Sequence, residues 1–141
     1  MDASHSTVAR RIAQAACDYE RHTRGHLPKS VTVVLSDDTL AITMHGALSP
    51  AEKALAETPT GAAHVQEFYQ YLFANTSASL RQEISRIAGA TVREAAAQIE
   101  TATGAVKVFA SGTIVQVFLL DGKVPADTWS GSGAEAMNET A

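Results

Sequence analysis

One amphipathic segment, residues 61–88, constrains the fold of this chain more than any other feature. Apolar side chains recur along it at helical spacing: Val65, Phe68, Tyr69, Leu72, Phe73, Leu80, Ile84 and Ile87. At 100° per residue, the steps from Phe73 to Leu80 and to Ile84 return to the same face within about 20°. The pattern therefore predicts one long helix from Gly61 to Ala88, which the polar residues 75–77 bend without changing its phase.

That helix is long for so small a protein. A chain of 141 residues is expected to form one domain with a radius of gyration of about 14 Å. The 28 residues of the segment would span about 42 Å as a helix. Part of its apolar face then needs a second subunit. We therefore expect a homodimer, formed through this helix, through the C-terminal strands, or through both.

A shorter amphipathic helix is expected before it, from about residue 5 to 23. Ser4 or Ser6 is available as its N-cap and Gly25 as its C-terminal stop. The single cysteine, Cys17, lies close to the apolar stripe of this helix and cannot form an internal disulfide. This cysteine usage fits a reducing compartment, and we interpret Cys17 as a structural thiol.

The strands are expected in two groups. Residues 31–36 and 39–45 alternate in polarity around the turn residues 36–39, which predicts a β-hairpin. Residues 105–110 and 113–120 predict a second hairpin, whereas residues 91–100 fit either a strand or a helix. The last 21 residues contain one lysine and four acidic residues among Gly, Ser and Ala.

The expected fold class is α+β, in one domain over residues 1–120. It comprises an N-terminal helix, a β-hairpin, a short capped helix, the long amphipathic helix and C-terminal antiparallel strands. These strands are expected in one mixed or antiparallel sheet, with helices on one face. Residues 121–141 are expected to be a partly disordered acidic tail.

The short helix has the clearest local signals. Ser49 is its expected N-cap, Pro50 occupies the first helical position and Glu52 completes a capping box. We expect this helix to run from Pro50 to about Glu57. The sequence 58–61 then stops it, and Thr60 is available to cap the helix that follows.

The candidate binding residues lie near this helix start and the end of the first helix. They are His45, Ser49, Glu52, Lys53, Arg24 and His26. The basic cluster 21–26 fits a helix C-terminus with a glycine cap, and alternatively a contact with a small anion or an anionic lipid. Reciprocal capping explains Ser49 and Glu52 without any catalytic role.

Several classes of protein are disfavoured. The histidines lie on different expected elements, and neither Cys-x-x-Cys nor His-Glu-x-x-His occurs, so we predict no metal site, no cofactor and no catalytic residues. The net charge of −4 and the lack of a basic stripe argue against nucleic-acid binding. The apolar run 114–120 is interrupted by Gln116 and is far shorter than a membrane-spanning helix. We expect a cytoplasmic protein.

The segment from Leu48 to Gly61 resembles the MpsC-like family, named for a component of a bacterial Na+-translocating membrane-potential-generating system. The family pattern is an apolar residue, Thr or Ser, Pro-Ala-Glu, a basic residue and Thr-x-x-Gly. Residues 28–31, 80–89 and 115–119 extend the resemblance, which covers about residues 8–120. It favours a strand after Gly89. The resemblance also implies that this chain is a small soluble partner of membrane modules for cation translocation or inorganic-carbon supply. Such a partner is expected in the cytoplasm or at the inner face of the membrane. The resemblance implies no established catalytic residues.

Two functions remain open from the sequence. The first is a non-catalytic accessory or regulatory protein of such a membrane system, which the absence of a catalytic set favours. The second is a small-molecule or anion-binding domain, or an enzyme, with a pocket between the first hairpin and the capped helix that uses His45, Ser49 and Lys53.

Overall fold

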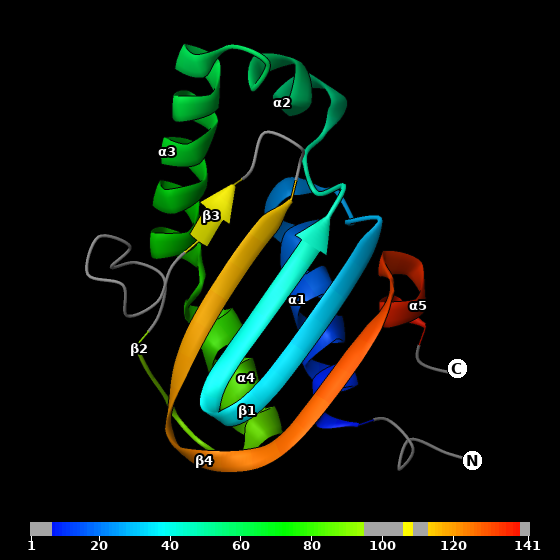
Figure 1. Cartoon of the computed structure of the whole chain (residues 1–141), viewed down its shortest axis with the longest axis vertical. Coiled ribbons are helices and arrows are strands. Elements are labelled where there is room, and N and C mark those ends of the chain that lie inside the picture. The colour runs from blue at the N-terminus through cyan, green and yellow to red at the C-terminus, as the bar shows by residue number, and fades with distance from the viewer. Residues whose placement is uncertain (1–6, 95–105, 109–112, 139–141) are drawn as a thin grey trace.

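Two long strands make up most of the sheet. In the computed structural model, which describes residues 7–94, 106–108 and 113–138, β1 (Ser30–His45) and β4 (Ile114–Ser132) pair antiparallel in two stretches. Residues 30–35 pair with 127–132, and residues 39–44 pair with 114–119. Each strand folds back on itself, so the two arms of β1 lie between the two arms of β4 (Figure 1).

The bends match the turn residues in the sequence. Asp37 has a φ of 54° at the bend of β1, in the region that Asp and Asn tolerate better than most residues. The predicted hairpin over 31–45 is confirmed. In the arms of β1, alternate residues face the core: Val31, Val33, Leu35, Leu40, Ile42 and Met44.

Two short strands complete the described sheet. β2 (Val92–Glu94) pairs with β4 through Val92 opposite Leu120, and β3 (Val106–Val108) pairs with it through Val108 opposite Ile114. Of the ambiguous segment 91–100, residues 92–94 are therefore strand, and the rest lies outside the described residues. The pairing of β3 with β4 confirms the predicted antiparallel C-terminal strands. The turn predicted between them lies outside the described residues.

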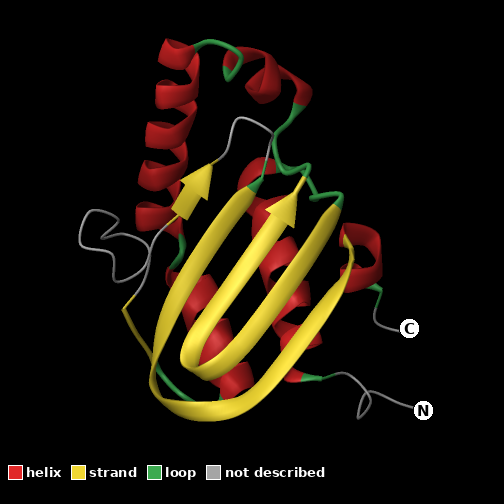
Figure 2. Cartoon of the chain, in the orientation of Figure 1, coloured by secondary structure: helices red, strands yellow, loops and turns green. Residues whose placement is uncertain are grey.

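Helices cover one face of this sheet. α1 (Val8–Arg24) and α4 (Ala78–Ala88) lie side by side behind it (Figure 2). The core between the layers contains Ile12, Cys17, Ile84 and Phe118, all with 0% of their surface exposed. The α+β class with helices on one face of an antiparallel sheet is confirmed.

The prediction of one helix over residues 61–88 is wrong. α3 (Pro59–Thr76) and α4 are separate helices that meet at Ser77, which is buried. The side chains just before the break bond back to main-chain carbonyls, Asn75 to Tyr71 and Thr76 to Leu72. Such bonds compete with regular helix geometry and bend helices. The break lets α4 pack under the sheet while α3 extends past its edge (Figure 1).

The phase of the apolar stripe survives the break. Val65, Tyr69 and Phe73 on α3 are buried, as are Leu80, Ile84 and Ile87 on α4. Phe68 departs from the prediction, because half of its surface is exposed. The length argument for a dimer loses its premise, since no single helix has to be covered over about 42 Å.

Three helix ends differ in detail from the predictions. α1 is capped by Thr7, whose side chain accepts a hydrogen bond from the Arg10 amide, rather than by Ser4 or Ser6. α3 is capped by Thr58 instead of Thr60, because Pro59 takes the first helical position. α2 (Pro50–Leu55) ends two residues early and has the expected capping box at Ser49 and Glu52.

The structure also differs from the expected acidic tail. Residues 121–132 form the second arm of β4, and residues 133–137 form α5 (Gly133–Met137), which packs beside α1. Asp127 accepts a hydrogen bond from the Ala9 amide at the start of α1. The Arg10 guanidinium stacks on the Trp129 ring, 5.7 Å from its centroid. Composition suggested a tail because this arm has an exposed outer face and few apolar residues.

Deleting residues 121–141 is therefore expected to abolish cooperative unfolding. The deletion removes the partner strand of residues 30–35 and the acceptor at the start of α1. A chain that ends at residue 138 keeps all of these contacts and serves as the control. Thermal unfolding followed by circular dichroism checks this, and a cooperative transition in the 1–120 chain at the temperature of the control would contradict it.

Candidate functional site

A buried arginine joins four parts of the chain. Arg24, in the last turn of α1, donates hydrogen bonds to Glu20 (2.7 Å), Glu52 (3.0 Å) and the Ala47 carbonyl (2.8 Å). It also donates to the Tyr69 hydroxyl, and its guanidinium lies 4.5 Å from the centroid of the Tyr69 ring. Only 5% of the Arg24 side chain is exposed. α1, the 46–48 loop, α2 and α3 therefore converge on one side chain.

Local sequence signals position its partners. Glu52 has two functions, because the same Oε1 atom accepts the Ser49 amide of the capping box (2.8 Å) and the Tyr69 hydroxyl (3.1 Å). Glu20 stands one helical turn before Arg24, the spacing that places two side chains on one helix face. We call Glu20, Arg24, Glu52 and Tyr69 the arginine cluster.

The arginine cluster contains two carboxylates for one guanidinium. Burial raises the pKa of Glu20 above its ordinary value, and the nearby Glu52 carboxylate adds to this, while Arg24 acts in the opposite direction. Burial disfavours the charged form of this carboxyl by more than Arg24 favours it, so Glu20 holds its proton more tightly than in water. The groups satisfy one another, which is typical of a structural cluster.

Glu20 gives the stability a specific pH dependence. The Glu20 carboxyl has a higher pKa in the folded chain than in the unfolded chain. Its contribution to stability is therefore complete below the pKa of a glutamate in the unfolded chain, about 4.3. That contribution is lost as the pH rises through the pKa of Glu20 in the folded protein. Relative to Glu20→Gln, the free energy of unfolding of the wild type should fall by up to about 1.4 kcal/mol per pH unit within that window.

Urea unfolding of both proteins between about pH 4 and pH 8 measures this difference. Glu57→Gln, at an exposed glutamate beyond the end of α2, controls for the loss of a surface carboxyl. A difference between wild type and Glu20→Gln that stayed constant or grew with pH would contradict the assignment.

The other sequence-predicted residues lie outside the arginine cluster or around it. His26 bonds to the Gly46 carbonyl (3.2 Å), and His45, exposed at the end of β1, bonds to the Thr113 hydroxyl (3.2 Å). Lys53 is exposed on α2. The structure therefore brings together Arg24, Ser49 and Glu52. The sequence interpretation missed Glu20 and Tyr69. Glu20 lies four residues before Arg24, and Tyr69 lies four residues before Phe73, so their helical spacing was an available signal.

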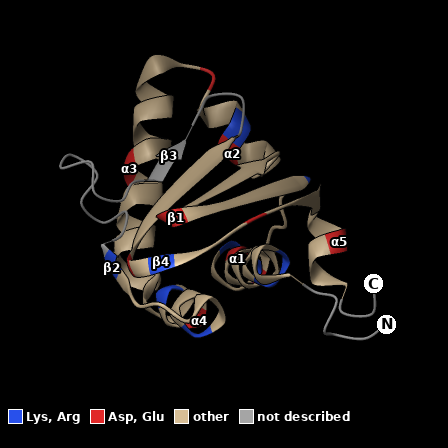
Figure 3. Ribbon diagram, turned by 60° about the horizontal axis from the view of Figure 1, so that its bottom comes forward, with Lys and Arg blue, Asp and Glu red and all other residues tan. Residues whose placement is uncertain are grey.

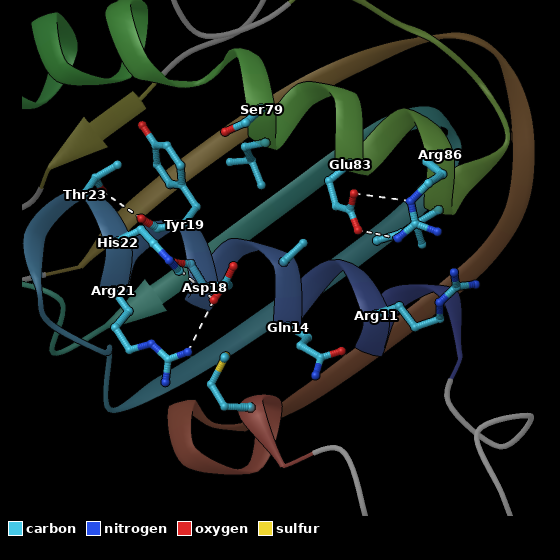
Figure 4. Close-up of a pocket in the computed structure, with 14 residues that line it drawn as sticks. Arg11, Gln14, Asp18, Tyr19, Arg21, His22, Thr23, Ser79, Glu83 and Arg86 are labelled. Atoms are coloured by element: carbon cyan, nitrogen blue, oxygen red, sulfur yellow. Dashed lines mark hydrogen bonds and ion pairs between the residues drawn. The ribbon is translucent and has the colours of Figure 1, made fainter.

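A groove lies elsewhere, between α1 and α4 (Figure 4). It has a volume of about 620 Å³, within the usual range of binding sites. Its residues are Arg11, Gln14, Ala15, Asp18, Tyr19, Arg21, His22, Thr23, Ser79, Leu80, Glu83, Arg86, Ile87 and Met137. None of the six candidate binding residues is among them, although Arg21, His22 and Thr23 belong to the basic cluster 21–26. The recurrence of polar residues at 11, 14, 18 and 21 along one helix face was the sequence signal for it.

Charges of both signs surround the groove. Asp18 pairs with Arg21 (3.3 Å) and His22 (3.4 Å), and Glu83 pairs with Arg86 on α4. The hydrogen bond from Arg86 lowers the pKa of Glu83. The Arg11 side chain has no hydrogen bond or ion pair among the described residues, and it lies near the Glu83–Arg86 pair (Figure 4). Figure 3 shows basic and acidic positions on both helices.

The lining of the groove also includes the apolar side chains of Ala15, Leu80, Ile87 and Met137. The nearby thiol is not a candidate nucleophile: Cys17 is buried, and burial raises its pKa to about 12. Within the described ranges no cluster of three His, Cys, Asp or Glu residues could hold a metal ion. Apolar side chains combined with ion pairs suit the binding of a peptide or helix.

In the part of the chain that the structure describes, no helix has the length and hydropathy needed to cross a membrane.

Comparison with known protein families gives a match over most of the chain. The model of the family described as "Na+-translocating membrane potential-generating system (MpsC)" matches residues 4–111. The matched range includes the arginine cluster and both helices of the groove, and it ends before β4. No curated protein matches the chain, and no solved structure matches it.

Proposed function

Because the chain belongs to the MpsC family, we propose that it is a non-catalytic accessory or regulatory subunit of a Na+-translocating system that generates a membrane potential. Family membership supports the association with such a system. The subunit would act on the cytoplasmic side, at the inner face of the membrane, and would bind a membrane module rather than conduct ions.

The groove between α1 and α4 carries this proposal. Its lining combines apolar side chains with the Asp18–Arg21 and Glu83–Arg86 ion pairs. An occupant that fits is a cytoplasmic segment of the membrane module with an apolar centre and charges of both signs, because ion pairs at the rim select a partner by complementary charge. Arg11, which has no ion pair among the described residues, is available to an acidic group on that segment.

The arginine cluster supports the non-catalytic part of the proposal. Its carboxylates, guanidinium and phenol bond to one another, which leaves no group poised to attack a substrate. Catalysis by general acids or bases needs a group within reach of substrate. We assign the arginine cluster to holding α2 and α3 against α1.

The proposal also includes a homodimer. The break at Ser77 removes the length argument for it, but α3 retains exposed aromatic side chains on its outer face. Two copies per assembly would present two grooves to the membrane module.

The Ala15→Glu variant tests the role of the groove. Ala15 is half-buried there, so a glutamate should occupy the space for the partner and add a like charge beside Asp18. In membrane vesicles from cells that lack this protein, added wild-type protein should restore the sodium-dependent membrane potential. Ala15→Glu should restore it at least about tenfold less effectively at equal concentration.

Ala51→Glu, at an exposed position of α2, is the matched control and should restore the potential fully. Both variants must unfold cooperatively at the wild-type temperature. A sodium-dependent potential that is the same with and without the wild-type protein would overturn the proposed function. Equal restoration by Ala15→Glu and wild type would overturn the role of the groove.

A further inference from the structure

The outer face of α3 exposes an aromatic pair. Phe68 and Tyr71 have 50% and 71% of their surfaces exposed, and their spacing of three residues places them on the same helix face. Leu55, on α2 just before α3, is 51% exposed. Among the described residues only one other large hydrophobic side chain is exposed, Val34 at 41%, on the face of the sheet away from the helices.

The opposite side of α3 fixes its orientation. Tyr69 is held in the arginine cluster, and the Phe73 ring contacts the rings of Tyr19 and Phe118, with centroids 6.4 Å and 5.8 Å away. Rotation of α3 to bury Phe68 would break these contacts. The aromatic pair is therefore presented outward by the fold and cannot turn into the core.

The charge content of α3 restricts what can cover this face. Glu67 is the only Asp, Glu, Lys or Arg residue of the helix, whereas a solvated helix face usually carries several charges. An anionic membrane surface or a nucleic acid would need lysine or arginine here. The face instead suits a nearly neutral, aromatic partner surface.

We propose that a second copy of the chain covers this face, with the two α3 helices packed antiparallel about a two-fold axis between Phe68 and Tyr71. This inference rests on the proposed homodimer and locates its interface. A two-fold axis places residue i against j and j against i. Phe68 of each copy then packs on Tyr71 of the other, a pairing that aromatic rings favour.

The same register avoids a clash of charges. Residues that face each other across the axis include His64 with Asn75 and Glu67 with Leu72. The two Glu67 positions lie about 7.5 Å apart along the helix axis, so the like charges do not meet. With 50% and 71% of their surfaces exposed in each copy, the Phe68 and Tyr71 side chains of two copies would together bury roughly 350–600 Å². This is below the usual area of a permanent interface, so the dimer dissociates on dilution.

Sedimentation velocity between about 1 and about 200 µM tests the interface. The wild type should shift with concentration from one chain of 14.8 kDa toward two. Tyr71→Glu should weaken association at least about tenfold. Val34→Glu is the matched control, because it places the same charge on the other exposed hydrophobic residue, and it should associate like the wild type.

The outcomes separate this inference from the proposed homodimer. A wild type that stays monomeric throughout overturns both. A dimer that survives Tyr71→Glu, or that Val34→Glu disrupts instead, overturns the α3 interface alone. The unfolding transition of each variant, followed by circular dichroism, should match that of the wild type because both positions are exposed.

Disulfide trapping tests the antiparallel register. His64→Cys and Asn75→Cys chains are mixed and oxidised; Cys17 is buried and does not compete. Disulfides between the two different variants should predominate over those between identical chains, because the register places residue 64 opposite residue 75. Predominance of links between two His64→Cys chains would overturn the antiparallel arrangement.

Discussion

The buried guanidinium of Arg24 determines how the two ends of this fold are joined. The sheet and the α1–α4 layer share one core, whereas α2 and the first half of α3 extend past the sheet edge. Arg24 connects them by bonding to Glu52 and Tyr69 from the last turn of α1. Loss of one partner from such a buried pair costs about 3–5 kcal/mol. The orientation of α3, and the face that it shows to solvent, follow from this contact.

The fold places the two proposed binding surfaces on different helices. Nesting of β1 within β4 makes most of the sheet from two strands, and α1 and α4 pack on one of its faces. The groove lies between those helices, and the aromatic pair lies on the exposed face of α3. The proposed partner in the groove and the proposed second copy on α3 would therefore contact separate helices.

Much of this fold was predictable because its signals are local. The capping box of Ser49 and Glu52, the stop at Gly25, the turn at Asp37 and the alternation in β1 all depend on residues within a few positions of one another. The apolar stripe also predicted six buried residues on α3 and α4. The candidate site was predicted only in part: Arg24, Ser49 and Glu52 were identified, and Tyr69 and the groove were not.

The sequence by itself determined the elements, the family and the side of each helix that faces the core, since periodicity and capping act over one or two turns. Tertiary structure alone decided the strand over residues 121–132 and the pairing of Arg24 with Tyr69. Tyr69 lies 45 positions from Arg24 in the chain, and the second arm of β4 lies farther still from its partner residues in β1. Only packing in three dimensions brings such residues within reach of a hydrogen bond.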